Sequence, residues 1–260
     1  RLKVGILPDF MAFVPSLAKD NPNLDSGYIE GLQNLSDKAL KARLLFGEWE
    51  YENNPHRIIE DRAIKNLTTN LYVRDEGARR YITADIARYG ADKFVCWVWR
   101  GWELVDVKTM AKGSLSEVVK RIEELRNKWE VQATNVVVDE DGLGGGVVDF
   151  SPGYQGFVTN RSVEENYANL GTLCAFKVAD RINRGQVLVG DVDEGELEML
   201  CLDMEAIERV PKEPGQPERI IPKDRIKEKL GGRSPDYWDA MKMREFFEVE
   251  QVDWSAFADL

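Results

Sequence analysis

Residues 135–139 read Asn-Val-Val-Val-Asp, a continuous apolar run that ends on a carboxylate. A strand that helices cover on both faces has such a run, whereas a half-exposed strand alternates apolar and polar residues. A glycine-rich stretch at 142–146 follows directly and opens an expected helix. We therefore expect residues 135–139 to form a buried strand in a sheet with helices on both faces.

The neighbouring segments extend this pattern into a mixed α/β sheet. Three strands precede the apolar run and are expected to form an antiparallel meander, over 81–86, 94–99 and 102–107. Residues 115–129 repeat apolar side chains with the 3.6-residue period of a helix. Later helices are expected around 163–183, 194–207 and 235–247. Trp97 and Trp99 point to one face of their strand, and we expect them to pack in the core rather than to stack on bases.

The composition excludes several kinds of site. The chain has 260 residues and one histidine, so it cannot form a site with two or more histidine ligands. Cys96, Cys174 and Cys201 form no C-x-x-C pair, which argues against structural zinc, an iron–sulfur cluster or a disulfide framework. No apolar run is long enough to span a membrane, so a membrane role is not expected.

The charge is unevenly distributed along the chain. With 35 Lys and Arg against 46 Asp and Glu, the net charge is −11, which by itself argues against a nucleic-acid partner. Residues 190–208, however, hold many of the acids and no Lys or Arg, whereas residues 211–233 are predominantly basic. The net charge therefore leaves a local nucleic-acid site open.

Four aspartates occupy positions that can converge. Asp85 and Asp139 end two expected strands, and Asp236 and Asp239 lie in the first turn of the last helix, three residues apart on one face. Strand ends in an open sheet meet at a crevice. Each aspartate alone has a structural alternative as a cap or a turn residue, so the prediction rests on the set.

A carboxylate cluster of this kind is a candidate metal site. Several carboxylates cannot remain ionised together unless a cation neutralises them. Oxygen ligands without His or Cys select Mg²⁺ or Mn²⁺. Two such ions about 4 Å apart would support phosphodiester hydrolysis without a histidine.

Three segments resemble the nuclease motifs of terminase large subunits of tailed bacteriophages. They are Asp-Ile-Ala-Arg-Tyr-Gly-Ala-Asp at 85–92, Val-Val-Asp-Glu-Asp-Gly-Leu-Gly-Gly-Gly-Val-Val-Asp at 137–149, and Gly-Arg-Ser-Pro-Asp-Tyr-Trp-Asp-Ala at 232–240. Residues 28–32 and 44–49 are similar to the stretch that joins the ATPase and nuclease parts of those proteins. The similarity extends over nearly the whole chain.

This resemblance implies a ribonuclease H-like fold and an endonuclease that cuts double-stranded viral DNA during genome packaging, using two Mg²⁺ or Mn²⁺ ions. It implies that Asp85, Asp139 and one or both of Asp236 and Asp239 bind metal. Asp92 is implied as a further ligand or an outer-sphere residue. The wider fold, including Holliday-junction resolvases, has a similar D-x-x-D pair on its last helix.

The resemblance also implies how the chain is divided and what it meets. Residues 1–72 would be the lead-in that joins the ATPase to the nuclease, 73–250 the nuclease domain and 251–260 a tail. The chain starts at Arg1 and has no P-loop, so we expect the ATPase part to be missing and no ATP site to be present. The implied partners are double-stranded DNA, the ATPase domain, the portal and the small terminase subunit, in the cytoplasm of a bacterial host at the procapsid portal.

Two features are candidate DNA contacts. Gly144 and Gly145 would let the backbone approach a phosphate, and the alternative is a flexible turn that opens a helix. Lys227, Lys229 and Arg233 precede the third motif and could track phosphates, although a solvated helix face explains them equally well.

Two other functions compete with the nuclease. Loose similarity of the first two motifs to phosphate loops favours an actin-like or sugar-kinase-like ATPase, but that fold needs a duplicated core, for which the chain is too short. The other alternative is a non-catalytic docking module of the packaging motor.

Overall fold

The computed structural model describes residues 26–34, 44–46, 54–86, 93–111, 113–141 and 144–250. The chain divides into two compact units, residues 1–55 and residues 56–260. In the first unit, helix α1 (Ser26–Gln33) has Leu32 as a buried residue and leaves Tyr28 half exposed.

The second unit begins at His56, ahead of the boundary expected at residue 73. Residues 56–72 contain the short helix α3 (Asp61–Lys65) and a 3-10 turn that starts at Leu71. Ile59 and Leu67 are almost fully buried, in the same core cluster as Trp97 and Trp99. Part of the expected lead-in therefore belongs to the core of the second unit.

A six-stranded mixed sheet forms the centre of this unit. Its strands lie in the order β5-β4-β1-β2-β3-β6. β1 pairs antiparallel with β2, and β2 with β3, which confirms the expected meander. β4 runs parallel to β1 and to β5, and β6 runs parallel to β3. The strands are β1 (Arg80–Asp85), β2 (Phe94–Arg100), β3 (Glu103–Met110), β4 (Val136–Asp139), β5 (Gln155–Phe157) and β6 (Leu188–Val189).

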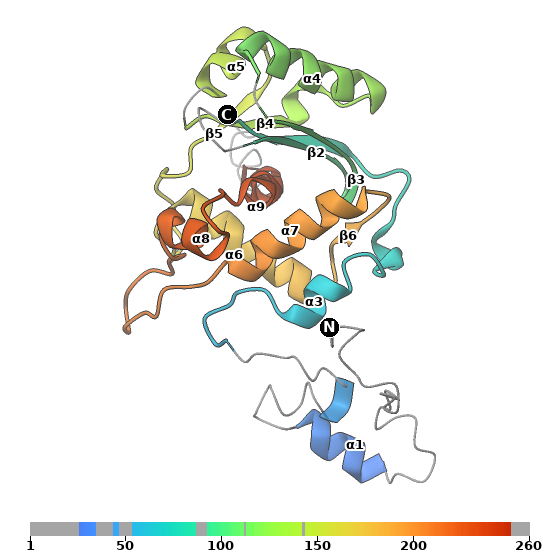
Figure 1. The fold of residues 1–260 in the computed structure, drawn as a ribbon, viewed down its shortest axis with the longest axis vertical. Coiled ribbons are helices and arrows are strands. Elements are labelled where there is room, and N and C mark those ends of the chain that lie inside the picture. The colour runs from blue at the N-terminus through green and yellow to red at the C-terminus, as the bar shows by residue number, and fades with distance from the viewer. Residues whose placement is uncertain are drawn as a thin grey trace, which may run out of the picture. The chain divides into compact units, whose positions relative to one another are not determined.

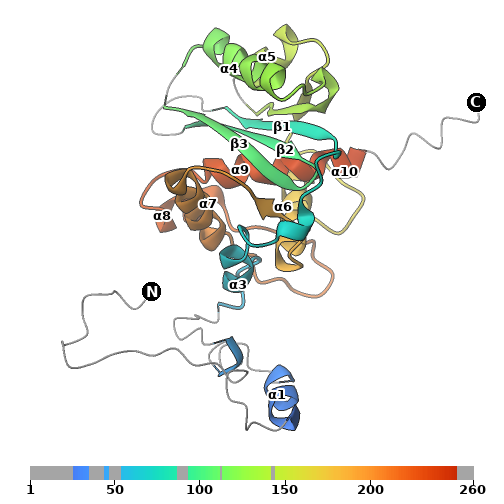
Figure 2. The same cartoon turned by 90° about the vertical axis from the view of Figure 1, so that its right-hand side faces the viewer.

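Helices cover both faces of the sheet, as expected (Figure 1). One face carries α4 (Leu115–Lys128) and α5 (Gly144–Phe150), and Figure 2 shows α9 on the opposite side of β1, β2 and β3. The second face is covered by α6 (Leu170–Asn183), α7 (Glu194–Ala206) and α9 (Asp236–Lys242). α8 (Lys223–Lys229) precedes α9, and α10 (Phe246–Glu250) ends the described chain.

The alternation of side chains along the strands separates two cores. In β2, Cys96 and Val98 pack in the cluster beneath α4, whereas Trp97 and Trp99 pack in the cluster beneath α6, α7 and α9. Both tryptophans have no exposed surface, which confirms that they are core residues.

Two helix expectations differ from the structure. The helix expected from residue 163 begins only at Leu170, because the Asn169 side chain caps it by accepting from the Thr172 N–H. The last helix, expected over 235–247, is divided by a 3-10 turn at Met243–Glu245 into α9 and α10. Among the described helices, none is both long and apolar enough to cross a membrane.

Candidate active site

Asp85 and Asp139 lie side by side at the ends of two parallel strands. The register pairs Ala84 of β1 with Val138 of β4, and the next residue in each strand is the aspartate. Asp139 lies two residues beyond Val137 and Asp85 two beyond Thr83, so both carboxylates project to the α9 face of the sheet. Asp85 is 7% exposed, and Asp139 is partly buried.

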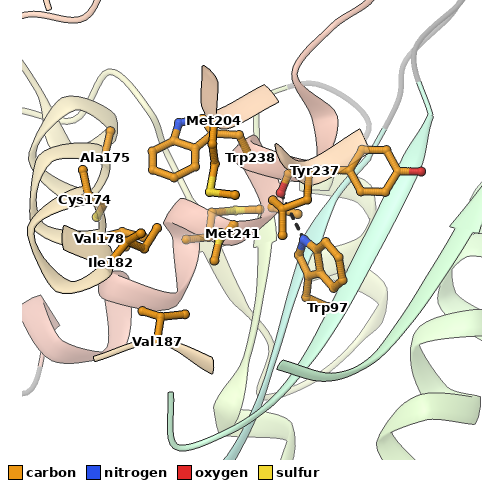
Figure 3. Close-up of a cluster of buried hydrophobic side chains, with 14 of the residues drawn as sticks. Trp97, Cys174, Ala175, Val178, Ile182, Val187, Met204, Tyr237, Trp238 and Met241 are labelled. Atoms are coloured by element: carbon orange, nitrogen blue, oxygen red, sulfur yellow. Dashed lines mark hydrogen bonds between the residues drawn. The ribbon is translucent and has the colours of Figure 1, made fainter. Parts of the chain in front are cut away.

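Helix α9 brings two further carboxylates to this edge of the sheet. Asp236 and Asp239 lie in its first turn, and Asp236 is only 6% exposed. Oδ2 of Asp236 accepts at 2.8 Å from the N–H of Lys93, the residue before β2. The indole N–H of Trp97 donates to the Tyr237 carbonyl at 3.0 Å and attaches α9 to the sheet (Figure 3).

Two lysines neutralise Asp239. Lys223 Nζ lies 2.7 Å from Oδ2 and Lys242 Nζ lies 2.5 Å from Oδ1, so each oxygen has its own cation. Oδ1 of Asp139 instead accepts from the Asp141 N–H at 3.1 Å. No described residue donates a hydrogen bond to the Asp85 carboxylate.

The protonation equilibria of Asp85, Asp139 and Asp239 differ accordingly. Burial, followed by the charge of Asp239, raises the pKa of Asp85 well above its usual value, and Lys223 only partly opposes this. Burial also raises the pKa of Asp139. For Asp239 burial acts in the same direction, but Lys242 and Lys223 outweigh it and lower the pKa to about 2. The aspartates are thus close enough to sense one another's charge.

The donor set fits a hard divalent cation, because it consists of carboxylate oxygens without His or Cys. Asp85 is a buried carboxyl group in need of a proton or a cation, which also fits. Within the described ranges, however, no three His, Cys, Asp or Glu side chains are grouped closely enough to hold a metal ion. The lysine ammonium groups stand at Asp239 instead.

A cavity of about 480 Å³ adjoins this cluster. Its charged side is formed by Asp139, Asp141, Asp239, Lys223 and Lys242. The remainder has mixed apolar and polar character and is lined among others by Thr159, Asn169, Thr172, Ile220 and Trp238. The cavity therefore combines space for a ligand with the carboxylate and lysine groups.

No family model and no curated protein matches the sequence. Among solved structures, the nuclease domain of the large terminase subunit gp2 of bacterial virus Sf6 matches with a TM-score of 0.62 at 18% identity. A variant of that domain with manganese and beta-thujaplicinol gives 0.62 at 17%, and a variant with calcium gives 0.61 at 18%. All three matches cover 72% of this chain and 97% of the other. The chain has the fold of a terminase nuclease domain.

The terminase nuclease fold is ribonuclease H-like, as the sequence predicted. It does not support the kinase-like ATPase, which needs two copies of the core, because the described residues form a single six-stranded sheet.

Several expected site residues lie elsewhere in this terminase-like fold or outside its described part. Asp92 lies outside the described residues. Gly144 and Gly145 open α5. A side chain at Gly145 would meet only Glu140, at 3.8 Å, so packing does not require glycine there.

The basic residues before α9 make ion pairs within the protein. Lys229 Nζ contacts Glu208, and Arg233 Nη1 contacts Asp203. Lys227 lies on α8 and is partly buried. Arg233 is directed inward, so any part it plays in holding DNA would compete with Asp203.

Sequence reasoning missed two residues of the site and its support. Lys242 follows Asp239 by three residues on the same helix, a spacing that predicts an ion pair. Asp203 lies between Leu200 and Met204 on the apolar side of α7, where a buried acid is unusual. The spacing of Lys242 from Asp239 and the place of Asp203 among apolar residues were the sequence signals that could have identified these two residues.

Proposed function

We propose that the chain is a metal-dependent endonuclease that cuts double-stranded viral DNA concatemers during genome packaging. The observation that carries this proposal is the convergence of Asp85, Asp139, Asp236 and Asp239 from two strands and one helix. The terminase nuclease fold supports the same reading, because a likeness of fold makes that activity a reasonable candidate.

Asp85, Asp139 and one or both of Asp236 and Asp239 would hold two Mg²⁺ or Mn²⁺ ions, with Asp92 as a further contributor. When bound, such ions supply the activation of a water molecule and the stabilisation of the oxygen that leaves the cut strand. The chain's own part is to keep Asp85 buried and Asp236 fixed by the Lys93 N–H. Lys223 and Lys242 would turn from Asp239 towards a DNA phosphate once a cation balances that carboxylate.

The adjoining cavity would receive the DNA strand at the cluster. Gly144, Gly145, Lys227, Lys229 and Arg233 are proposed to contact the backbone on either side. The net charge of −11 opposes tight binding by this chain alone, so we expect weak, non-specific activity. An ATPase domain on the same polypeptide would supply the remaining hold on DNA.

The wider setting follows from this proposal. The lead-in segment before the nuclease would join it to the ATPase domain, and the portal and the small terminase subunit would be its partners. The place of action would be the bacterial cytoplasm, at the portal of the procapsid. A docking module without catalysis is the alternative that the cleavage experiment decides.

The test is cleavage of supercoiled plasmid by the full chain with Mn²⁺ or Mg²⁺. We expect Asp85→Asn and Asp139→Asn each to lower the cleavage rate by more than about 100-fold, the upper end of what loss of an outer-sphere partner costs a metal site. Asp180→Asn is the matched control, because Asp180 is an exposed acid on α6 and lies outside the three motifs. A wild-type chain that fails to cut, or two aspartate variants that cut normally, would leave the docking module as the better reading.

A further inference from the structure

A buried acid lies directly behind the helix that carries two of the candidate metal ligands. Asp203 of α7 has no exposed surface. Its Oδ2 accepts from the N–H groups of Tyr237 at 3.0 Å and Trp238 at 3.2 Å, and its Oδ1 pairs with the Arg233 guanidinium. All three partners belong to the entrance of α9 or its first turn.

Asp203 does the work that a capping residue of α9 itself would do. The residue at the N-cap position is Pro235, which provides no side-chain acceptor. The first N–H groups of a helix have no partner within it and must find one elsewhere. Here a carboxylate from another helix accepts from two of them.

The same contacts fix the position of the helix from two sides. The Tyr237 peptide carbonyl accepts from the Trp97 indole on β2, while the Tyr237 N–H donates to Asp203 on α7. Tyr237 therefore holds α9 between α7 and the sheet, and Figure 3 shows its bond to Trp97 on the sheet side. In the sequence Tyr237 stands between Asp236 and Asp239.

Arg233 extends this attachment to the loop before the helix. Gly231 and Gly232 have φ values of 68° and 97°, a conformation that other residues adopt at a cost. Arg233 follows them and pairs with Asp203, so the ion pair fixes the chain immediately after its most permissive point. Burying a carboxylate is costly, and the guanidinium and two N–H groups offset only part of that cost, since burial still raises the pKa of Asp203 to about 7.

We propose that Asp203 is a positioning residue for the candidate metal site: by binding the first turn of α9 and Arg233, it holds Asp236 and Asp239 against the ends of β1 and β4. This inference rests on the proposed function, since it assigns Asp203 a task in the same site. Asp203 itself touches neither the metal nor the DNA.

The experiment measures Mn²⁺ binding to the full chain by titration calorimetry, together with hydrogen exchange of the segment 236–242. In Asp203→Ala we expect Mn²⁺ affinity to fall about 10- to 100-fold, as is usual when an outer-sphere partner is lost. The amides of α9 should exchange faster. In Asp203→Asn one oxygen can still accept from both N–H groups, so affinity and exchange should return towards the wild-type values.

Glu103→Ala is the matched control for lost stability. Glu103 is also a buried acid with arginine partners, Arg74 and Arg100, but it lies at the start of β3. The Glu103→Ala substitution should lower thermal stability and leave Mn²⁺ affinity unchanged. If Asp203→Ala does not fold, Asp203→Asn is compared with Glu103→Ala instead. The positioning role then predicts a small loss of Mn²⁺ affinity in Asp203→Asn and none in Glu103→Ala.

The outcomes separate the two proposals. A wild-type chain that binds Mn²⁺, with Asp203 variants that bind it equally well, overturns the positioning role and leaves the nuclease proposal standing. Equal loss of affinity in Glu103→Ala also overturns it, because the effect would then be general destabilisation. A wild-type chain that binds no Mn²⁺ overturns both.

Discussion

At the scale of single residues, burial and neighbouring charges together set the pKa values of Asp85, Asp139 and Asp239. Asp239 has two lysines and a pKa of about 2, whereas Asp85 has no hydrogen-bond donor among the described residues and a raised pKa. Within one cluster, the pKa of one aspartate is therefore raised and that of another is lowered. A site can in this way hold one carboxyl group that keeps its proton and another that stays ionised, as some catalytic sites require.

Asp106 of β3, outside the candidate site, shows the same competition between burial and bonding partners, and it gives a pH-dependent prediction. Burial acts to raise its pKa, but bonds from Lys128 Nζ at 2.6 Å and the Trp129 indole at 2.8 Å outweigh burial and lower it. A lowered pKa stabilises the folded state above the unfolded value of 3.8, and this stabilisation disappears as the pH falls through the folded pKa.

We expect Asp106→Asn to lower the free energy of unfolding by about 1 kcal/mol at pH 7, because it weakens charge-assisted hydrogen bonds that are partly exposed. The difference from wild type should shrink as the pH falls below 3.8. Urea unfolding across this range measures it. A difference that is constant with pH would contradict the assignment.

The sequence could indicate some residues of the candidate site and not others. Asp85 and Asp139 were predictable because strand alternation and strand ends fix where a side chain points. Asp203 was not, because its partners Tyr237 and Trp238 lie more than thirty residues away and only packing of α7 on α9 brings them together. Likewise, Lys223 could be assigned to a basic stretch, but its pairing with Asp239 depends on the path of the loop between α8 and α9.

At the scale of elements, α9 is short and depends on its contacts. A helix of seven residues is not stable alone, so packing must hold it. Its fixed points are the Trp97 indole and Asp203.

Trp97→Phe tests the attachment to the sheet. It removes the donor to the Tyr237 carbonyl and leaves space in the core, so we expect a loss of about 2–4 kcal/mol in unfolding free energy. Hydrogen exchange of segment 236–242 should also accelerate. Trp99→Phe is the control, because Trp99 is equally buried but its indole donates to Thr83 within the sheet. Equal acceleration in both variants would show that Trp97 has no special hold on α9.

The fold class could be predicted at this scale, and the edges of the sheet could not. The meander and the apolar strand have clear patterns, and the sheet contains both. β5 and β6 have only three and two residues, too few for a period to be read, and only the sheet beside them defines them. The division of the last helix likewise depends on packing.

At the scale of the whole molecule, the second unit includes residues that the sequence assigned to a lead-in. The composition of residues 56–72 predicts no strand or long helix, so their burial could be recognised only in the folded structure. Ile59 and Leu67 are buried in the main core on either side of α3, which packs against α6 and α7.

Two shortened chains test this boundary. A chain of residues 56–250 should unfold cooperatively at a temperature close to that of the second unit in the full chain. A chain of residues 73–250 should lose about 6–12 kcal/mol, because it lacks four buried Ile and Leu side chains worth about 1.5–3 kcal/mol each, Ile58, Ile59, Ile64 and Leu67. Calorimetric melting measures both. Equal stability of the two would place the domain start at residue 73 after all.

The order of the site along the chain has a consequence for synthesis on the ribosome. Asp85 and Asp139 belong to strands made early, whereas α9 with Asp236 and Asp239 follows almost one hundred residues after β4. While α9 is still inside the exit tunnel, the emerging polypeptide has half of the four carboxylates. If the chain is the proposed nuclease, it would be unable to cut nucleic acid beside the ribosome until α9 has left the exit tunnel and completed the set of carboxylates.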